Sequence, residues 1–523
     1  MTNTLARRRG RVGSLRAWVG FAVAGLSGWC APALAQPLNT EIERLLSRSK
    51  LGTEQAGVVV TMLGDTPGED RLVASVGGDR RFIPASNQKV ITSGAALLVL
   101  GAEYSFRTEV RVAGDRVIVV GSGDPALLDP EMLAKSEARL TVQGVLRTLA
   151  GAVKRAGVGS VSEVIVDDRA FDRVARHPSW PARHLGEAYC PEVGGVNVHG
   201  NLMSLFVRPG ASPGAPPTLT VEPSGSFIEV ENQARTGTKE ANTIGAERTG
   251  DGNRLRVRGV ISAAPAGPIE VSMRDPARYF GMLLAEALVA EGVTVGGGAE
   301  GGARAWERAR TAQADEVFEG AKTVAVVTTP IADVLKKCNT SSNNMYAEAL
   351  LKAAGRAVTG EPGSFENGAT VVRMMLSERV GPRASSSTTI ADGSGLSELN
   401  RVSASTLTGW LVAMARVEAV SGVFIDSLAG IHEGSVRNRF RGHSLKNTLR
   451  AKTGHINGVS TLSGYLTDEA TGRRVAFSVL TNFAGNNDRL SASMEFQREV
   501  VKAADAWLAR EVSAESRVLK QGG

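Results

Sequence analysis

The sequence predicts a mixed α/β (α+β) fold, in which a domain of helices and antiparallel strands is interrupted by one or two β-rich inserted domains. Three observations support this prediction. Residues 36–101 alternate between helical and strand patterns. Residues 102–325 consist mostly of short β-rich runs. Residues 326–515 return to helical patterns and end in three strands and a helix. We therefore expect 36–101 and 326–515 to form one domain around the insert 102–325, and we favour two nested domains over one for this insert.

The first part of this domain contains a helix, two strands and a second helix. Gln36–Lys50 has its apolar residues on one side, as in an amphipathic helix. Two strands are expected at Val58–Met62 and Arg71–Val76, with a polar turn between them. The next helix begins near Ser86, and its residues Val90–Leu98 are apolar almost all round. Because such a helix is normally buried, we expect Ser86 at the N-terminus of a buried helix.

Residues 102–325 have a different sequence pattern from residues 36–101, because Gly, Pro and Ser separate their short apolar runs. Only 141–157 and 276–292 have a clear helical pattern. The expected strands are Arg107–Val112, Arg116–Val120, Ser162–Val166, Gly195–Val207, Leu219–Val221, Phe227–Val230 and Leu255–Val260.

The last part of the chain is first helical and then β-rich. The expected helices are Ile331–Cys338, Met345–Gly355, Gly368–Val380 and Ser403–Val417. Three strands and a final helix follow, at Leu449–Thr453, Thr461–Leu466, Val475–Thr481 and Leu490–Glu511.

Residues 1–35 have the three parts of a secretory signal peptide. Residues 1–16 contain five arginines and no acidic residue, and the apolar stretch Ala17–Leu26 follows them. Ala33-Leu34-Ala35 then offers small residues for cleavage. The apolar stretch is too short for a membrane anchor, because about 20 residues are needed to cross a bilayer. Cys30 does not fit a lipoprotein site, because a bulky tryptophan directly precedes it. We therefore expect a periplasmic protein, and the arginine triplet leaves a twin-arginine export route open.

Most of the net positive charge of the chain comes from the expected signal peptide, residues 1–35. Five of the 60 basic residues and none of the 53 acidic ones lie before residue 36, so cleavage lowers the net charge from +7 to about +2. A nucleic-acid partner is therefore not expected. Loose membrane association and the oligomeric state stay open.

No metal or cofactor is expected. The six histidines show no metal-ligand spacing. Gly210–Gly214 matches the G-x-S-x-G motif of a nucleophile elbow, but it lies in a Pro-rich run and not between a strand and a helix. Gly296–Gly301 matches the G-x-G-x-x-G motif, but the helix that a dinucleotide site needs does not follow it. Cys190 and Cys338 remain after cleavage, and either a disulfide or two buried thiols fits them.

Ser86-Asn87-Gln88-Lys89 places a hydroxyl and an amine one helical turn apart. A serine hydroxyl is a poor nucleophile at neutral pH and needs a base within hydrogen-bond reach. Because positions i and i+3 share a helix face, we expect Lys89 beside Ser86 Oγ. The helix N-terminus favours anionic character at Ser86, and desolvation beside other cations lowers the pKa of a lysine. Ser86 is therefore the candidate nucleophile, and Lys89 is the candidate proton acceptor.

Ser342-Asn343-Asn344 lies between two expected helices. There Ser342 can relay a proton, and Asn344 can orient the lysine and bind a substrate amide. Like S-x-x-K, this motif is weak alone, so the order and the structural context of the motifs carry the prediction.

Lys452-Thr453-Gly454 lies on an expected strand at the edge of a cleft. Lys452 would supply positive field, Thr453 a hydroxyl for a carboxylate, and Gly454 room for the close approach of substrate backbone. The candidate oxyanion hole consists of two backbone N–H groups, those of Ser86 and His455.

Together with Pro84–Thr92, Ser341–Glu348 and the turn Asp392-Gly393-Ser394-Gly395-Leu396-Ser397, these motifs resemble the low-molecular-mass class C penicillin-binding proteins, typified by penicillin-binding protein 4. The resemblance covers nearly all of residues 38–512. It implies a β-lactamase/transpeptidase-like domain with inserted domains. It also implies a serine D-Ala-D-Ala carboxypeptidase/endopeptidase that cleaves peptidoglycan stem peptides through an acyl-enzyme and is inhibited by β-lactams.

The sequence departs from the family pattern in two places. A Ser or Thr usually follows the K-T-G motif, and His455 stands there instead. Family members can also carry an acidic residue shortly after a Trp-Pro pair, whereas Trp180-Pro181 is followed by Arg183 and His184. The preference for the substrate's third residue therefore stays open.

Two other functions remain as alternatives. A β-lactamase or esterase with the same triad would turn penicillin over instead of keeping a lasting acyl group. A non-catalytic cell-wall binding protein would bind muropeptides and release no D-alanine. Carboxypeptidase and endopeptidase action are not separated by the sequence, because both use one site and differ only in the amine that leaves.

Overall fold

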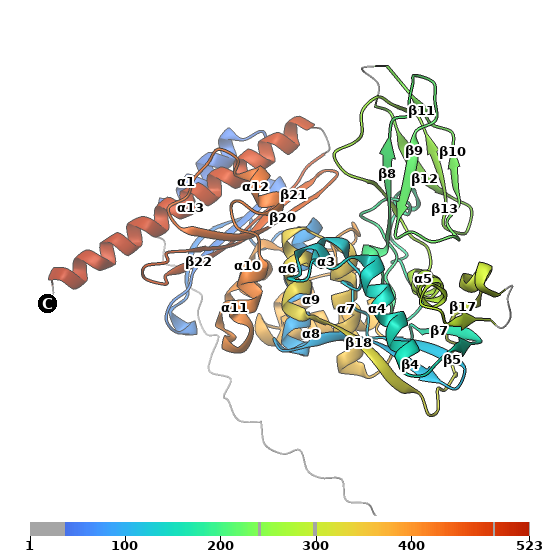
Figure 1. Cartoon of the computed structure of the whole chain (residues 1–523). Coiled ribbons are helices and arrows are strands. Elements are labelled where there is room, and N and C mark those ends of the chain that lie inside the picture. The colour runs from blue at the N-terminus through green and yellow to red at the C-terminus, as the bar shows by residue number, and fades with distance from the viewer. Residues whose placement is uncertain (1–36, 239–241, 297–300, 485–486, 522–523) are drawn as a thin grey trace, which may run out of the picture.

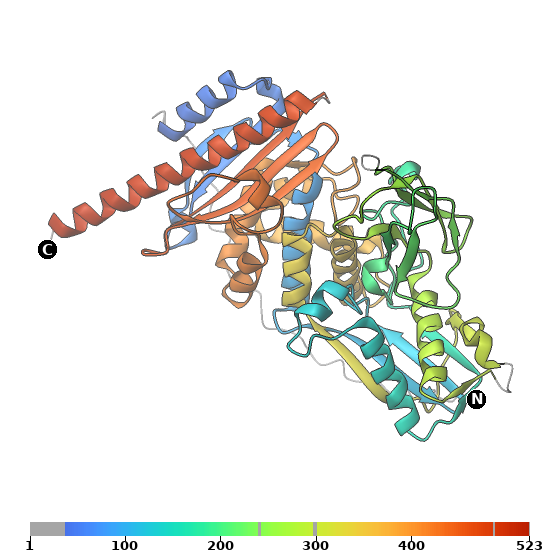
Figure 2. The same cartoon turned by 45° about the horizontal axis from the view of Figure 1, so that its top comes forward.

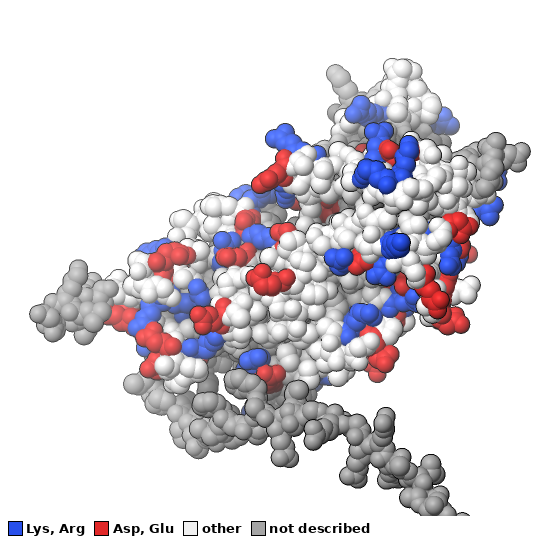
Figure 3. All heavy atoms as spheres, turned by 60° about the horizontal axis from the view of Figure 1, so that its bottom comes forward, with Lys and Arg blue, Asp and Glu red and all other residues white. Residues whose placement is uncertain are grey.

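The computed structural model describes residues 37–238, 242–296, 301–484 and 487–521. The expected signal peptide, residues 1–35, lies outside the described residues. Within the described part of the chain, no helix combines the length and the apolarity needed to cross a membrane. Over most of the face seen in Figure 3, acidic and basic side chains lie close to one another.

One five-stranded antiparallel sheet is built from both ends of the described chain (Figure 1). Its central pairing joins the first strand to the last, with Val59 opposite Ser478. Lys452, Thr453 and Gly454 lie on the strand at one edge of this sheet. The strand order is β2-β1-β22-β21-β20, with bounds β1 Ala56–Met62, β2 Arg71–Val76, β20 Thr448–Ile456, β21 Val459–Thr467 and β22 Arg474–Asn482.

Two helices lie side by side across one face of this sheet (Figure 2). They are α1 (Pro37–Arg48) and the long final helix α13 (Asn487–Gln521). Their apolar residues, such as Ile42 and Val500, are fully buried in one core with the sheet residues of that face. The terminal helices therefore close the back of the sheet.

A layer of helices covers the other face, and α2 (Gln88–Leu100) lies at its centre. Residues 88–97 of α2 are buried on every side, which explains their apolar pattern. The indole Nε1 of Trp410 donates a hydrogen bond of 3.0 Å to the carbonyl of Val90 and fixes one neighbour of α2. The surrounding helices are α6 (Ile331–Thr340), α7 (Asn344–Thr359), α8 (Phe365–Arg379), α10 (Ala404–Arg416) and α11 (Glu418–Ser427).

Residues 105–330 form further sheets around a separate apolar core. A mixed five-stranded sheet, in order β17-β7-β5-β4-β18, packs against two helices, and smaller sheets extend beyond it (Figure 1). The main sheet and its helices are β4 Ser105–Ala113, β5 Arg116–Gly121, β7 Glu163–Asp167, β17 Ala309–Thr311, β18 Lys322–Pro330, α4 Val142–Arg155 and α5 Pro276–Ala290. The smaller sheets contain β8 Leu202–Arg208, β9 Thr218–Glu222, β15 Ile269–Ser272, β10 Val230–Asn232, β12 Gly245–Thr249 and β13 Arg254–Arg258.

The predicted mixed fold is confirmed, but the expected strand Gly195–Val207 is wrong over its first half. Strand β8 begins only at Leu202. His199, Gly200 and Asn201 have φ values of 55°, 66° and 55°, which belong to a left-handed turn and not to a strand. The Asn201 side chain holds this turn by hydrogen bonds to neighbouring backbone.

Other differences concern the ten-residue helix α11, which the sequence prediction lacks, and several short elements. The run Phe227–Val230 contributes only its last residue to β10. Three six-residue helices are absent from the sequence prediction, because so few residues carry too little periodicity to indicate a helix. They are α3 (Pro130–Lys135), α9 (Pro382–Ser387) and α12 (Gly434–Arg439).

Asp129 ties the insert to the two helices that flank Ser342. Its carboxylate caps α3 and accepts hydrogen bonds from the backbone of that helix. It also accepts from Lys337 Nζ on α6 at 2.7 Å and from the Tyr346 hydroxyl on α7 at 2.7 Å. Asp129 is 3% exposed, so these partners are the ones that replace water around its charge.

Asp129→Ala should lower the free energy of unfolding by about 3 kcal/mol, because it removes a helix cap and leaves the buried hydroxyl of Tyr346 without its carboxylate acceptor. Glu131→Ala is the matched control: its half-exposed side chain pairs with Lys135 and Lys337, and its loss should cost about 1 kcal/mol or less. Urea unfolding of both variants measures the difference. Equal losses would contradict the anchoring role of Asp129.

Candidate active site

Ser86 lies in a single 3-10 turn, η3 (Ala85–Asn87), that leads directly into α2. Lys89 is one turn further on, and its Nζ lies 3.0 Å from Ser86 Oγ. The Lys89 side chain is completely buried. The spacing in the sequence therefore places the hydroxyl and the amine in direct contact.

Two further acceptors surround the amine of Lys89. Asn344 Oδ1 accepts a hydrogen bond from Nζ at 2.6 Å, and the carbonyl of Ser394 accepts one at 2.8 Å. A neutral amine has two N–H groups and one lone pair. Because both N–H groups are engaged by atoms that only accept, the lone pair is directed at Ser86 Oγ, in the position of a base.

Burial lowers the pKa of Lys89 from 10.5 to about 8, although the nearby Cys338, Glu348 and Asp392 oppose this shift. At pH 7 a lysine with this pKa is neutral in about one molecule in ten, far more often than an ordinary lysine. The arrangement can therefore activate a serine without a histidine.

The S-x-N motif forms the turn between α6 and α7. Asn343 caps α7, because its side chain accepts a hydrogen bond from Tyr346 N. Ser342 has a φ of 58°, a conformation that costs energy for a serine and that points its side chain out of the helical path. Asn344 follows as the first residue of α7 and reaches Lys89.

Lys452 joins Ser342 to the edge strand. Its Nζ donates to Ser342 Oγ at 2.8 Å and to the carbonyl of Thr453 at 2.7 Å. Burial, and next the charge of Lys89, hold the pKa of Lys452 well below its ordinary value of 10.5. The hydroxyl of Ser342 thus contacts the amine of a buried lysine, as the hydroxyl of Ser86 does.

Beyond Ala451, no strand of the described part of the chain pairs with the outer edge of β20. The N–H and the carbonyl of Ala451 both point away from β21, because they pair with Ala429. In an antiparallel ladder every second residue points to the same side, so the backbone groups of Thr453 and His455 face the same edge. The imidazole of His455 is exposed, and its Nδ1 lies 3.1 Å from the carbonyl of Val459.

Gly454 is required for the close approach of β20 to the serine. A Cβ at this position would lie 2.2 Å from Thr461 Oγ1 and 2.9 Å from Ser86 N. Asn87 Nδ2 also reaches Thr461 Oγ1, at 2.8 Å, and the carbonyl of Lys452, at 3.2 Å. The glycine therefore allows the close fit between β20 and the turn that carries Ser86. The room for substrate backbone that the sequence indicates at Gly454 stays a prediction.

The turn 392–397 supports Lys89 from the other side. Glu348 is fully buried and accepts hydrogen bonds from Gly393 N at 2.7 Å and Ser394 N at 2.9 Å. Burial, and next the charge of Asp392, raise the pKa of Glu348 to about 8. Gly395 has a φ of 83°, and a Cβ there would lie 1.8 Å from the carbonyl of Ala85. The turn therefore packs directly against the residue before Ser86.

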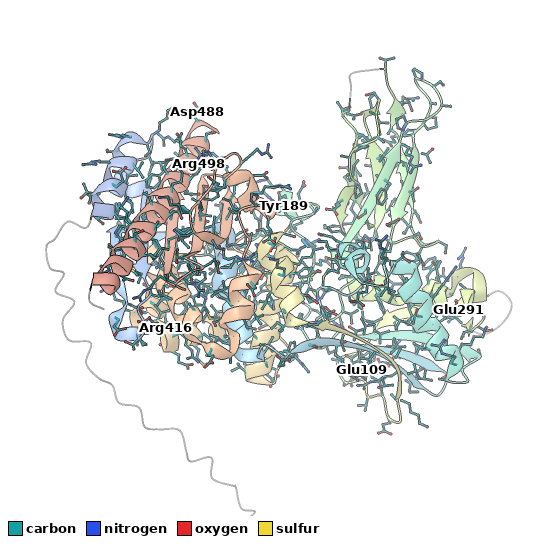
Figure 4. The ribbon with its side chains drawn as sticks, turned by 60° about the vertical axis from the view of Figure 1, so that its left-hand side comes forward. Glu109, Tyr189, Glu291, Arg416, Asp488 and Arg498 are labelled. Atoms are coloured by element: carbon teal, nitrogen blue, oxygen red, sulfur yellow. The ribbon has the colours of Figure 1, made fainter. Side chains whose placement is uncertain are left out.

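The insert reaches this site through residues 177–190. Trp180 Nε1 donates to Asp392 at 2.8 Å. The carbonyl of Tyr189 accepts a hydrogen bond of 2.6 Å from Asn344 Nδ2, where the insert meets the helical layer (Figure 4). Arg183 lies exposed in the same segment. Cys190 and Cys338 are both buried free thiols and do not form a disulfide.

The structure brings Ser86, Lys89 and Asn344 together, and Ser342, Lys452 and Thr453 form the adjoining group. Sequence reasoning missed the carbonyls of Ser394 and Tyr189, which no side-chain pattern can show. It also missed Ser435 on α12, whose hydroxyl contacts the hydroxyl of Thr453. Among the described residues, no group of His, Cys, Asp and Glu could hold a metal ion.

Gly454→Ala should slow acylation by benzylpenicillin about 10-fold or more and lower the free energy of unfolding by about 2 kcal/mol, because the added methyl forces β20 away from the serine. Gly68→Ala is the control, since no atom lies within 4 Å of the added methyl. Intact-mass kinetics and urea unfolding measure both effects. A Gly454→Ala protein with native acylation would contradict the close fit.

Comparison with known proteins agrees with this geometry. Residues 38–510 match the D-Ala-D-Ala carboxypeptidase 3 (S13) family. The chain is 31% identical, over 487 residues, to a D-alanyl-D-alanine carboxypeptidase of an Actinomadura species, covering 86% of this chain and 83% of that protein. It is 25% identical over 437 residues to the D-alanyl-D-alanine carboxypeptidase DacB of Haemophilus influenzae, covering 80% of this chain and 84% of that protein.

The fold is similar to the crystal structure of penicillin binding protein 4 from Haemophilus influenzae. The TM-score is 0.67 at 22% identity, with 88% of this chain and 99% of that chain covered. The predicted transpeptidase-like fold is therefore confirmed. The chain belongs to the D-Ala-D-Ala carboxypeptidase 3 (S13) family, which confirms the family and the reaction class predicted from its motifs.

Proposed function

We propose that this chain is a serine D-Ala-D-Ala carboxypeptidase/endopeptidase that acts on peptidoglycan stem peptides through an acyl-enzyme on Ser86. The observation that carries the proposal is the contact of 3.0 Å between Lys89 Nζ and Ser86 Oγ, with both N–H groups of the amine held elsewhere. It supplies a nucleophile and its base within one turn of a buried helix.

Acylation begins at the carbonyl of a D-alanyl residue. Ser86 Oγ forms a bond to the carbonyl carbon while its proton moves to Lys89 Nζ. The carbonyl oxygen takes up the displaced electron pair, and the backbone N–H groups of Ser86 and His455 stabilise its charge. The N–H of His455 suits this role because it faces the free edge of β20.

The tetrahedral intermediate then releases the amine. The bond between carbon and nitrogen breaks, and Ser342 passes a proton to the leaving nitrogen, supported by the contact of 2.8 Å with Lys452. Lys89 gives the proton that it took from Ser86 to the oxygen of Ser342, so the net result is the transfer of one proton from Ser86 to the leaving amine. Water next attacks the ester, its proton restores the serine hydroxyl through Lys89, and the shortened peptide leaves as a carboxylate.

Asn344 and the edge strand position the substrate. Asn344 is held between Lys89 and the carbonyl of Tyr189, so its amide is fixed at the rim of the site. Thr453 offers its hydroxyl to a carboxylate beside the scissile bond, and a substrate backbone can pair along β20 as an added strand. These contacts favour a peptide, and not an isolated small molecule, as the natural ligand.

The periplasm is the compartment we propose. The leader pattern of residues 1–35 and the family's peptidoglycan substrate both support an exported enzyme. β-lactams are proposed as acylating inhibitors, because they present a strained amide to the same serine.

Ser86→Ala should abolish the mass adduct that benzylpenicillin leaves on the native protein, and Lys89→Met should slow its formation by about 10²- to 10⁴-fold through loss of the base. Intact-mass spectrometry over time measures both. Ser47→Ala, at an exposed position on α1, is the control and should acylate like the native protein. An undiminished adduct on Ser86→Ala would overturn the mechanism, and rapid turnover without an adduct would favour a β-lactamase.

Native protein should release D-alanine from monomeric pentapeptides and should also cleave D-alanyl cross-links in muropeptide dimers, because one acyl-enzyme serves both leaving amines. Chromatographic separation of the products from each substrate measures the balance. Binding of both substrates without any product would support the non-catalytic alternative.

A further inference from the structure

Arg439, at the end of α12, is a buried cation that pairs with no acidic residue in the described part of the chain. Its side chain is 5% exposed, and within the described residues its Nε and Nη1 have no hydrogen-bond partner. Its Nη2 makes only a long contact of 3.4 Å to the hydroxyl of Ser460. The charged group that most affects it is another cation, Arg498. A guanidinium in this position lacks the anion that normally accompanies a buried charge.

The position of Arg439 links it to the substrate edge. Ser435 and Arg439 are four residues apart on α12, so they share one face of that helix. The hydroxyl of Ser435 contacts the hydroxyl of Thr453. The Ser460 that Arg439 reaches lies opposite His455 in the ladder of β20 and β21. Arg439 therefore lies one helical turn beyond a pair of hydroxyls, on the side of the sheet to which Thr453 points.

Lys452 does not supply charge on this side. Successive residues of a strand point to opposite faces, so the side chains of Lys452 and Thr453 diverge. The ammonium of Lys452 is already engaged by Ser342 and by the carbonyl of Thr453. The low pKa of Lys452 also reduces the charge it can offer. A carboxylate at Thr453 thus needs another source of positive charge.

The other charged groups near α12 do not fill this role. Glu433 lies at the start of α12, but it pairs with Lys336 and Arg450. Arg437 is exposed on the outer side of the helix. Arg498 has the carboxylate of Glu499 at 3.6 Å. Among the described residues around α12, Arg439 is therefore a buried charge left without an anion.

We propose that Arg439 supplies the fixed positive charge of a carboxylate subsite, in which the hydroxyls of Thr453 and Ser435 contact the carboxylate next to the scissile bond. This inference rests on the proposed function and specifies how the substrate's terminal carboxylate is selected. A guanidinium suits the role, because it stays charged when buried and offers several donors in a fixed plane. Peptides that end in a free carboxylate are bound in preference to their amides or esters.

Arg439→Gln should lower the acylation rate with benzylpenicillin by about 10- to 100-fold, because it removes one partner of a buried charge pair. The same variant should acylate with benzylpenicillin methyl ester within about 3-fold of the native rate, because the ester carries no charge for Arg439 to attract. An N-acylated D-Ala-D-Ala peptide and its C-terminal amide form a second pair of substrates, with and without the carboxylate, for the same comparison. Intact-mass kinetics and D-alanine release provide the rates.

Arg437→Gln is the matched control, since it removes an exposed arginine from the same helix and should leave both rates unchanged. Arg439→Lys keeps a charge but loses reach, and its preference for the acid over the ester should lie between those of the native protein and Arg439→Gln. If Arg439→Gln does not fold, this second variant decides the question.

The outcomes separate the inference from the function on which it rests. If the native protein reacts neither with benzylpenicillin nor with the N-acylated D-Ala-D-Ala peptide, the proposed function fails. If the native protein acts and Arg439→Gln slows acid and ester equally, Arg439 has a structural role and the subsite is overturned. Unchanged rates with both probes would overturn it as well.

Discussion

The buried amine of Lys89 is the interaction on which the rest of the site depends. An ammonium in this position would need strong anionic compensation, and the nearest ligands of Nζ are instead a serine hydroxyl, an amide oxygen and a backbone carbonyl. Burial therefore lowers its pKa to about 8 and makes the neutral amine accessible. The same burial requires that every neighbour be held in place, because a displaced acceptor would leave an N–H group of the amine unpaired. The turn 392–397, the start of α7 and the turn that carries Ser86 are accordingly fixed by buried or partly buried hydrogen bonds.

The order of the chain explains how such distant residues meet. Strands β1 and β22 pair although the whole insert lies between them in the sequence. The same sheet continues through β21 to β20, whose Gly454 lies close to the backbone of Ser86. The insert leaves the helical layer before β4 and returns through β18 into α6, which leads directly to Ser342. It is anchored to this layer by Asp129, and it contributes the Tyr189 carbonyl to the rim of the site. The insert is thus part of the construction of the site as well as an addition to the fold.

Much of this architecture could be predicted from the sequence. The all-round apolar pattern of α2 indicates burial, and the spacing of Ser86 and Lys89 indicates their contact. The sequence could not show the carbonyl of Ser394, because backbone acceptors leave no mark in residue identity. It could not show Arg439 either, because an arginine on a six-residue helix resembles a surface residue until the packing of β20 and β21 is known. The turn at His199–Asn201 was also missed, because its left-handed conformation depends on hydrogen bonds between the Asn201 side chain and the backbone of Val198 and Glu192, which an apolar pattern does not show.

The central claim is that neutral Lys89 takes the proton of Ser86, and the pH dependence of acylation tests it most directly. The second-order rate constant for benzylpenicillin is measured on native protein between about pH 6 and pH 10 by intact-mass kinetics. Because the pKa of Lys89 falls from 10.5 to about 8, deprotonation should activate the serine, and the rate should rise with pH to half its maximum near pH 8. A rate that does not change over this range, or that rises only as pH approaches 10.5, the ordinary pKa of lysine, would contradict the account.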